Sequence, residues 1–132
     1  MMRTFPVLAL IALGACQTKN EMRNLPSDSG VPKTYVAPYD KVRNACEDSL
    51  REVYFKINDK DSHALDSNRY QILASQNAAS GNRYARIHVE NQGTQCTVWV
   101  VVRSKIDSRE NDPTDTLVAE DLQKKIAGRL TK

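Results

Sequence analysis

Hydrophobic and polar residues alternate along the middle of the chain with the period of two that β-strands require. The alternation is strongest in residues 83–90 and 95–105, and a shorter version spans residues 69–75. The apolar side of the two strongest segments consists of Ala85, Ile87, Val89, Cys96, Val98, Val100 and Val102. Residues 91–94 between them are typical of a hairpin connection. The pattern predicts a sheet of three or four antiparallel strands, with a short strand at residues 34–37 along its edge.

Two other segments have the period of an amphipathic helix. In residues 38–55 one face of the predicted helix is apolar and consists of Val42, Ala45, Cys46, Ser49, Leu50 and Val53. A strand is expected to begin at the end of this segment, within residues 54–57. The second helix begins at Pro113, and its apolar residues recur every four positions at Val118, Leu122, Ile126 and Leu130. Two such helices need one sheet face to cover. We therefore expect an α+β domain of two layers, with an N-terminal and a C-terminal helix covering a three- to four-stranded antiparallel sheet.

The beginning of the chain indicates export. Arg3 precedes an apolar run from Val7 to Leu13, which is far shorter than the roughly 20 residues of a membrane-spanning helix and is typical of a secretory signal peptide. The run ends in Leu13-Gly14-Ala15-Cys16, which resembles the lipobox of bacterial lipoproteins. The resemblance implies that residues 1–15 are removed and that Cys16 becomes an N-terminus carrying acyl chains such as palmitate. An ordinary signal peptide is the alternative, although Leu13 stands where its cleavage site needs a small residue.

The residue after the cysteine is Gln17, whereas Asp at this position retains lipoproteins of enteric bacteria in the inner membrane. By this resemblance the protein is expected at the outer membrane, with its domain in the periplasm. Residues 16–33 are polar and contain Pro26, Gly30 and Pro32, a composition that predicts a flexible tether. The folded domain is then expected to span residues 34–132.

Composition and motifs give no sign of catalysis. The chain has a net charge of +3, and its predicted domain is close to neutral, so no electrostatic footprint for nucleic acid is expected. The two histidines, His63 and His88, fall in no catalytic or metal-binding motif. Asp59, Asp61 and Asp66 near His63 lack the glycine and distal glutamate of a calcium loop, so we interpret this segment as a solvated loop. We expect no enzyme activity, no cofactor and no metal.

The remaining two cysteines lie on apolar faces of different elements. Cys46 belongs to the first helix and Cys96 to the strongest strand, so both side chains should enter the same layer. In an oxidising compartment this arrangement predicts a disulfide between them, and two buried free thiols are the alternative. On the opposite side of the strands lie Trp99, Tyr84 and His88. Either the tether or a loop shields Trp99, or the three residues form a surface that binds a partner.

The order of elements resembles the helix-grip domains of the outer-membrane assembly lipoprotein BamC. The chain is also similar to small bacterial lipoproteins of unknown function whose domain opens with a shared sequence pattern. In this chain the pattern corresponds to Ala37, Pro38, Tyr39, Asp40, Val42, Ala45 and Leu50. This chain departs from the usual pattern because no glycine ends the first helix. The first hypothesis for function is a non-enzymatic, lipid-anchored accessory subunit that binds another envelope protein. The second is a small lipoprotein that holds a lipid or another apolar ligand between helix and sheet.

Overall fold

The computed structural model describes residues 21–78, 81–104 and 113–131. The predicted signal peptide and its lipobox, including Cys16, lie outside the described residues. In chain order the described elements are β1 (Val31–Tyr35), α3 (Tyr39–Glu52), β2 (Lys56–Ile57), the 3-10 turn η1 (Asp59–Asp61), β3 (His63–Asp66), β4 (Arg69–Ala78), β5 (Gly81–Asn91), β6 (Cys96–Arg103) and α4 (Pro113–Leu130). Residues 21–24 add a short helical turn before β1.

The described strands form one antiparallel sheet. Its order is β1-β6-β5-β4-β2, and β3 pairs with β4 beside β2. The prediction of an α+β fold is confirmed, but the expected count of three or four strands is wrong because the sheet has six. The main strand that the hydrophobic pattern missed is β3, whose four residues are all exposed and therefore show no alternation. The edge strand β1 also begins three residues earlier than expected, at Val31.

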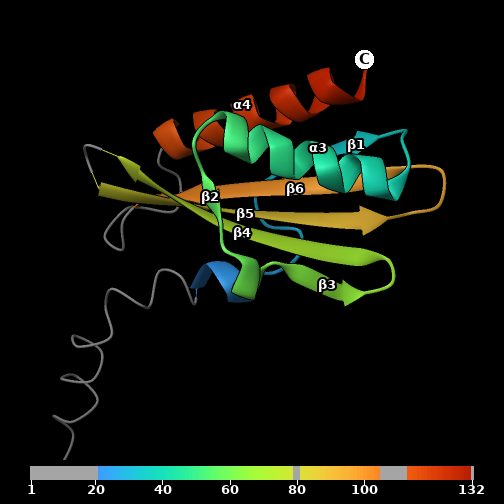
Figure 1. The fold of residues 1–132 in the computed structure, drawn as a ribbon, viewed down its shortest axis with the longest axis horizontal. Coiled ribbons are helices and arrows are strands. Elements are labelled where there is room, and N and C mark those ends of the chain that lie inside the picture. The colour runs from blue at the N-terminus through green and yellow to red at the C-terminus, as the bar shows by residue number, and fades with distance from the viewer. Residues whose placement is uncertain (1–20, 79–80, 105–112, 132) are drawn as a thin grey trace, which may run out of the picture.

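Helices α3 and α4 lie side by side over one face of the sheet (Figure 1). The apolar positions of the predicted alternation face them: Ile87, Val98 and Val100 are fully buried, together with Val42 and Leu50 of α3. The buried apolar residues of both helices and of β1, β4, β5 and β6 form one core cluster. Burial of this face is the main stabilising contribution to the fold.

A buried glutamine joins α4 to the edge of the sheet. The side-chain amide of Gln123 donates hydrogen bonds to the carbonyl oxygens of Val31 at 2.8 Å and Val98 at 2.9 Å. The hydroxyl of Tyr35 donates back to Gln123 Oε1 at 2.6 Å. Since a buried amide without partners would be costly, this arrangement fixes the position of α4 against β1 and β6.

The other face of the sheet is crossed by residues 21–30, here named the strap. Met22 is 1% exposed and packs with Leu73 and Val101, and Leu25 lies against the same cluster. Nη1 and Nη2 of the buried Arg86 donate to the carbonyl oxygens of Leu25 at 2.8 Å and Pro26 at 2.9 Å. These contacts hold the strap against β4, β5 and β6.

Both ends of the strap are also fixed. Near its beginning, Arg23 donates to the buried carboxylate of Asp61 at 2.8 Å. At its end, Gly30 has a φ of +101°, and a Cβ there would collide with the carbonyl oxygen of Val100. Only glycine fits this backbone conformation and this close approach. In the structure the strap therefore packs against the folded domain, whereas a flexible tether through residue 33 and a domain starting at residue 34 were expected.

Candidate interaction surfaces

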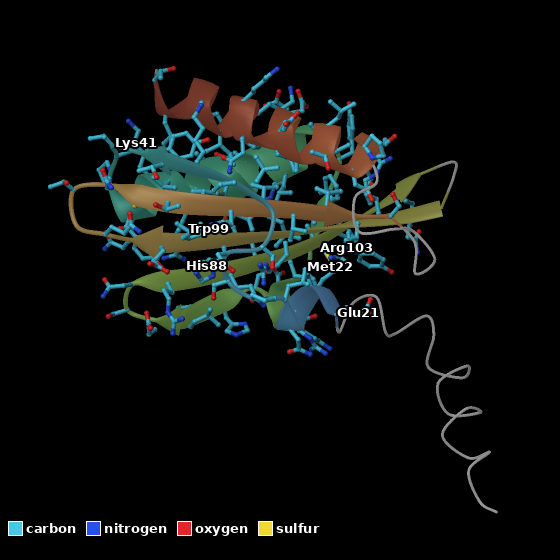
Figure 2. The ribbon with its side chains drawn as sticks, turned by 180° about the vertical axis from the view of Figure 1, so that it is seen from behind. Glu21, Met22, Lys41, His88, Trp99 and Arg103 are labelled. Carbon is cyan, nitrogen blue, oxygen red and sulfur yellow. The ribbon has the colours of Figure 1, made fainter. Side chains whose placement is uncertain are left out.

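Trp99, Tyr84 and His88 lie on the sheet face opposite the two helices. In the register of β5 and β6, His88 stands beside Trp99 and Tyr84 stands beside Arg103. The ring centroids of His88 and Trp99 are 5.5 Å apart and the ring planes make an angle of 49°. Figure 2 shows this pair in the middle of the sheet, apart from the short helical turn that carries Met22.

The three residues do not form one continuous surface. The row formed by Leu73, Arg86 and Val101 separates Tyr84 from the His88–Trp99 pair. Tyr84 packs against the cluster around Met22, so the strap shields part of it. His88 is 1% exposed, whereas Trp99 keeps part of its surface accessible.

The imidazole of His88 lies in an environment that disfavours its charge. Burial lowers its pKa below the ordinary value of 6.5, and the neighbouring positive charge of Arg86 lowers it further. The carboxylate of Glu90 opposes both effects from 3.7 Å away, and Nε2 has no hydrogen-bond partner in the described chain. We interpret His88 as a neutral group that supports the ring of Trp99.

The two cysteines of the domain are buried in the same core cluster, as their helix and strand positions predicted. Both are free thiols in this structure, so the predicted disulfide is not formed here. Burial raises the pKa of both thiols, and Cys96 Sγ donates to the carbonyl oxygen of Ala37 at 3.7 Å. In this state the thiols pack as small hydrophobic groups, and the bridge stays a prediction for experiment.

A groove of about 350 Å³ opens on the side of the sheet that the helices cover, where the end of α3 meets the beginning of α4. We name it the helix groove; it is lined by Val53, Phe55, Leu117, Val118 and Leu122, with Gln76, Arg83, Thr114 and Asp121 among them. Leu117 is 63% exposed there, although it is one of the larger apolar side chains of α4. The side-chain amide of Gln76 donates to the Val53 carbonyl at 2.6 Å and so fixes one wall of the groove.

Tyr54 lies between two lining residues of the helix groove, and its side chain is 86% exposed. Its φ is +68°, in the left-handed region, and no other described non-glycine residue has a positive φ. The amides of Tyr54 and Phe55 donate to the carbonyls of Arg51 at 3.0 Å and Leu50 at 2.9 Å. These bonds form a Schellman cap, in which the left-handed position is usually glycine. Tyr54 therefore takes the place of the glycine that the sequence lacks at the end of this helix.

A second cavity, of about 370 Å³, lies between the end of the strap, β6 and the first turn of α4. Its buried carboxylate, Asp115, accepts hydrogen bonds from the amide and the hydroxyl of Ser104, at 2.9 and 2.6 Å. Arg83 Nε lies 3.7 Å from the same carboxylate. These contacts give Asp115 a structural role, since it joins the end of β6 to the beginning of α4.

No group of three or more potential metal ligands occurs among the residues that the structure describes. The acidic segment that was considered for calcium is divided between η1 and β3, and its Asp61 is paired with Arg23. Within the described ranges, no helix has the length and hydrophobicity to cross a membrane.

Comparison with known proteins gives a fold and no family. No protein-family model matches the chain, and no curated protein matches it significantly. Among solved structures, the chain is similar to the vertebrate conserved region of human METTL16, with a TM-score of 0.51 and 10% sequence identity. The similarity covers 76% of this chain and 98% of that region. At this identity the likeness concerns the α+β fold alone.

The helix groove and the exposed Tyr54 were not predicted from the sequence. The missing glycine was the available signal, because a helix that must end in a Schellman cap without glycine forces another residue into the left-handed region. The strap also had a signal, since Met22 and Leu25 are spaced like one face of a helical turn within an otherwise polar segment.

Proposed function

We propose that this protein is a non-enzymatic lipoprotein of the bacterial outer membrane whose periplasmic domain acts as an accessory subunit. The anchor is the acylated Cys16, and the partner is another envelope protein. The docking site is the helix groove together with Tyr54. The proposal rests on the lipobox for the location and on the groove for the interaction.

The observation that carries the interaction is the strained and exposed Tyr54. A tyrosine in the left-handed region costs roughly 1–2 kcal/mol relative to ordinary backbone conformations, and glycine would remove this cost. The side chain offers no packing in return, because 86% of it is accessible. Aromatic residues of this kind are common anchors of protein interfaces, and the exposed Leu117 and the apolar walls of the groove supply a neighbouring surface.

The test compares the wild-type protein with Tyr54→Gly in cells whose envelope proteins have been crosslinked before purification. We expect a distinct partner with the wild type and its loss with Tyr54→Gly, while the amount of folded protein stays equal. Leu65→Ala is a matched control, because Leu65 is an exposed apolar residue of β3 that does not line the groove. A partner captured equally by all three proteins would reject the groove as the docking site.

A second candidate function is the binding of a lipid or another apolar ligand, and the size of the helix groove favours it. Pockets for small molecules have volumes of roughly 300–1,000 Å³, and the groove has about 350 Å³. The helix-grip-like arrangement also favours ligand binding, because helix-grip folds hold ligands between helix and sheet. Native mass spectrometry of the purified domain separates the two candidates: a co-purifying lipid that is lost in Leu117→Asp supports ligand binding.

The anchor is tested separately. Cys16→Ser removes the acylated sulfur, so we expect an unprocessed precursor and no mature protein in the outer-membrane fraction. A mature Cys16→Ser protein that still fractionates with the outer membrane would reject the lipobox.

A further inference from the structure

The docked strap leaves little chain between the proposed anchor and the folded domain. Only residues 17–20 separate Cys16 from Glu21, the first described residue of the strap. A fully extended chain spans at most about 3.6 Å per residue, so these five steps cover about 18 Å at most. A tether that continued to residue 33 would reach roughly three times as far.

The strap also sets where the chain leaves the domain. Met22 lies on the sheet face that the helices do not cover, packed with Leu73 and Val101, and Arg23 pairs with Asp61 at the β4 side of the sheet. The helix groove lies on the side of the sheet that the helices cover, between the residues that follow α3 and the first turns of α4. Figure 2 shows the short helical turn with Glu21 and Met22 on the same side of the sheet as His88 and Trp99.

The sheet face that the strap crosses, which carries Trp99, is here named the strap face. We propose that the strap face lies against the lipid headgroups and that the helix groove points away from the membrane. This inference rests on the proposed acylation of Cys16 and adds an orientation to it. The occupant of the strap face is the lipid surface itself, because a short chain that ends at this face holds it there. The charges of the strap are mixed, with Glu21 and Asp28 against Arg23, so the short anchor rather than electrostatic attraction defines the contact.

The contacts that hold the strap have a role in the proposed orientation of the domain. Arg86 binds two strap carbonyls with a guanidinium that is itself 1% exposed, and Met22 fills an apolar site. If the strap were released, the same anchor would allow the domain to move away from the membrane and turn freely. The strap therefore fixes both the height and the direction of the helix groove.

Trp99 is the single tryptophan of the chain and provides a native reporter for this test. The acylated full-length protein is inserted into vesicles of phosphatidylethanolamine and phosphatidylglycerol that contain a lipid with a spin-labelled headgroup. The comparison protein carries Trp99→Phe and Leu117→Trp, which moves the reporter to the helix groove. We expect the spin label to quench Trp99 at least about twofold more strongly than the tryptophan at position 117, because the chain keeps Glu21, at the beginning of the strap, within about 18 Å of the acylated Cys16.

A flexible insertion is the control. About 12 Gly and Ser residues placed between Lys19 and Asn20 restore a long tether, so the difference between the two reporters should disappear. Equal quenching of both reporters in the acylated protein without the insertion would overturn the orientation alone. A mature chain whose mass contains no acyl groups would overturn the anchor and the orientation together.

Discussion

The amide of Phe55 donates a 2.9 Å hydrogen bond to the carbonyl of Leu50, and this bond holds the intervening Tyr54 in the left-handed region with a φ of +68°. The bond closes the last turn of α3 and turns the chain toward β2. A side chain at this position is strained because its Cβ approaches a neighbouring carbonyl oxygen. The fold therefore has a local preference for glycine that this sequence does not follow.

Replacement of Tyr54 by glycine should leave the domain at least as stable as the wild type. Relief of the left-handed strain stabilises the native state, and the greater freedom of glycine in the unfolded chain offsets part of the gain, so we expect an increase of up to about 1 kcal/mol. Urea denaturation of the soluble domain measures it. Tyr54→Ala keeps the strain and removes the ring, so it serves as the matched control. A loss of stability in Tyr54→Gly would mean that the ring supports the fold.

Met22→Ala tests whether the strap is part of the domain. Met22 is buried in the cluster with Leu73 and Val101, and truncation of a buried methionine costs about 2 kcal/mol or more. We expect a loss of about this size in the free energy of unfolding. Asn24→Ala is the control, because Asn24 is exposed in the same turn and should change stability by less than about 0.5 kcal/mol. If both variants behave alike, the strap is a free tether.

The pairing of Cys46 with Cys96 is a chemical prediction. Both thiols are buried in one core, and a bridge would close a loop of about 50 residues, worth roughly 4 kcal/mol in the chain-entropy model. We expect the periplasmic protein to contain this disulfide. The protein is unfolded without reductant and alkylated, and its mass is measured by mass spectrometry. A mass without added alkyl groups supports the bridge. Two alkylated thiols would instead match the free thiols of this structure.

His88 should make stability depend on pH below neutrality. Burial lowers the pKa of the folded imidazole below 6.5, so the unfolded chain binds a proton first as the pH falls. Stability should therefore be greatest above about pH 6.5 and should decrease from there down to the lowered pKa of His88. Arg86 and Arg69 favour this decrease, and Glu90 opposes it. Denaturation of the wild type and His88→Gln across this pH range measures it; an unchanged slope in His88→Gln would assign the dependence to other groups.

Periodicity predicted the elements whose stability comes from burying one side. The alternation in β5 and β6 and the apolar faces of α3 and α4 identified the core, because burial is the main cause of their order. The strand β3 and the strap do not depend on burying an alternating apolar side. Backbone pairing with β4 orders β3, and contacts with Arg86 and Asp61 order the strap. Polar composition cannot distinguish β3 from a free loop, and in the strap only the spacing of Met22 and Leu25 differs from that of a free loop. The place of Trp99 on the outer face was predicted, but the strap over its neighbours was not.

The most direct test of the proposed function is photo-crosslinking at position 54 in living cells. A photoreactive phenylalanine analogue replaces Tyr54 in the full-length protein, and the same analogue at Leu65 serves as the control on a different exposed surface. We predict that light produces one dominant adduct with an envelope protein at position 54, and that this adduct is absent at position 65. Equal patterns at both positions, or an adduct at position 65 alone, would contradict the proposal that Tyr54 and the helix groove bind the partner.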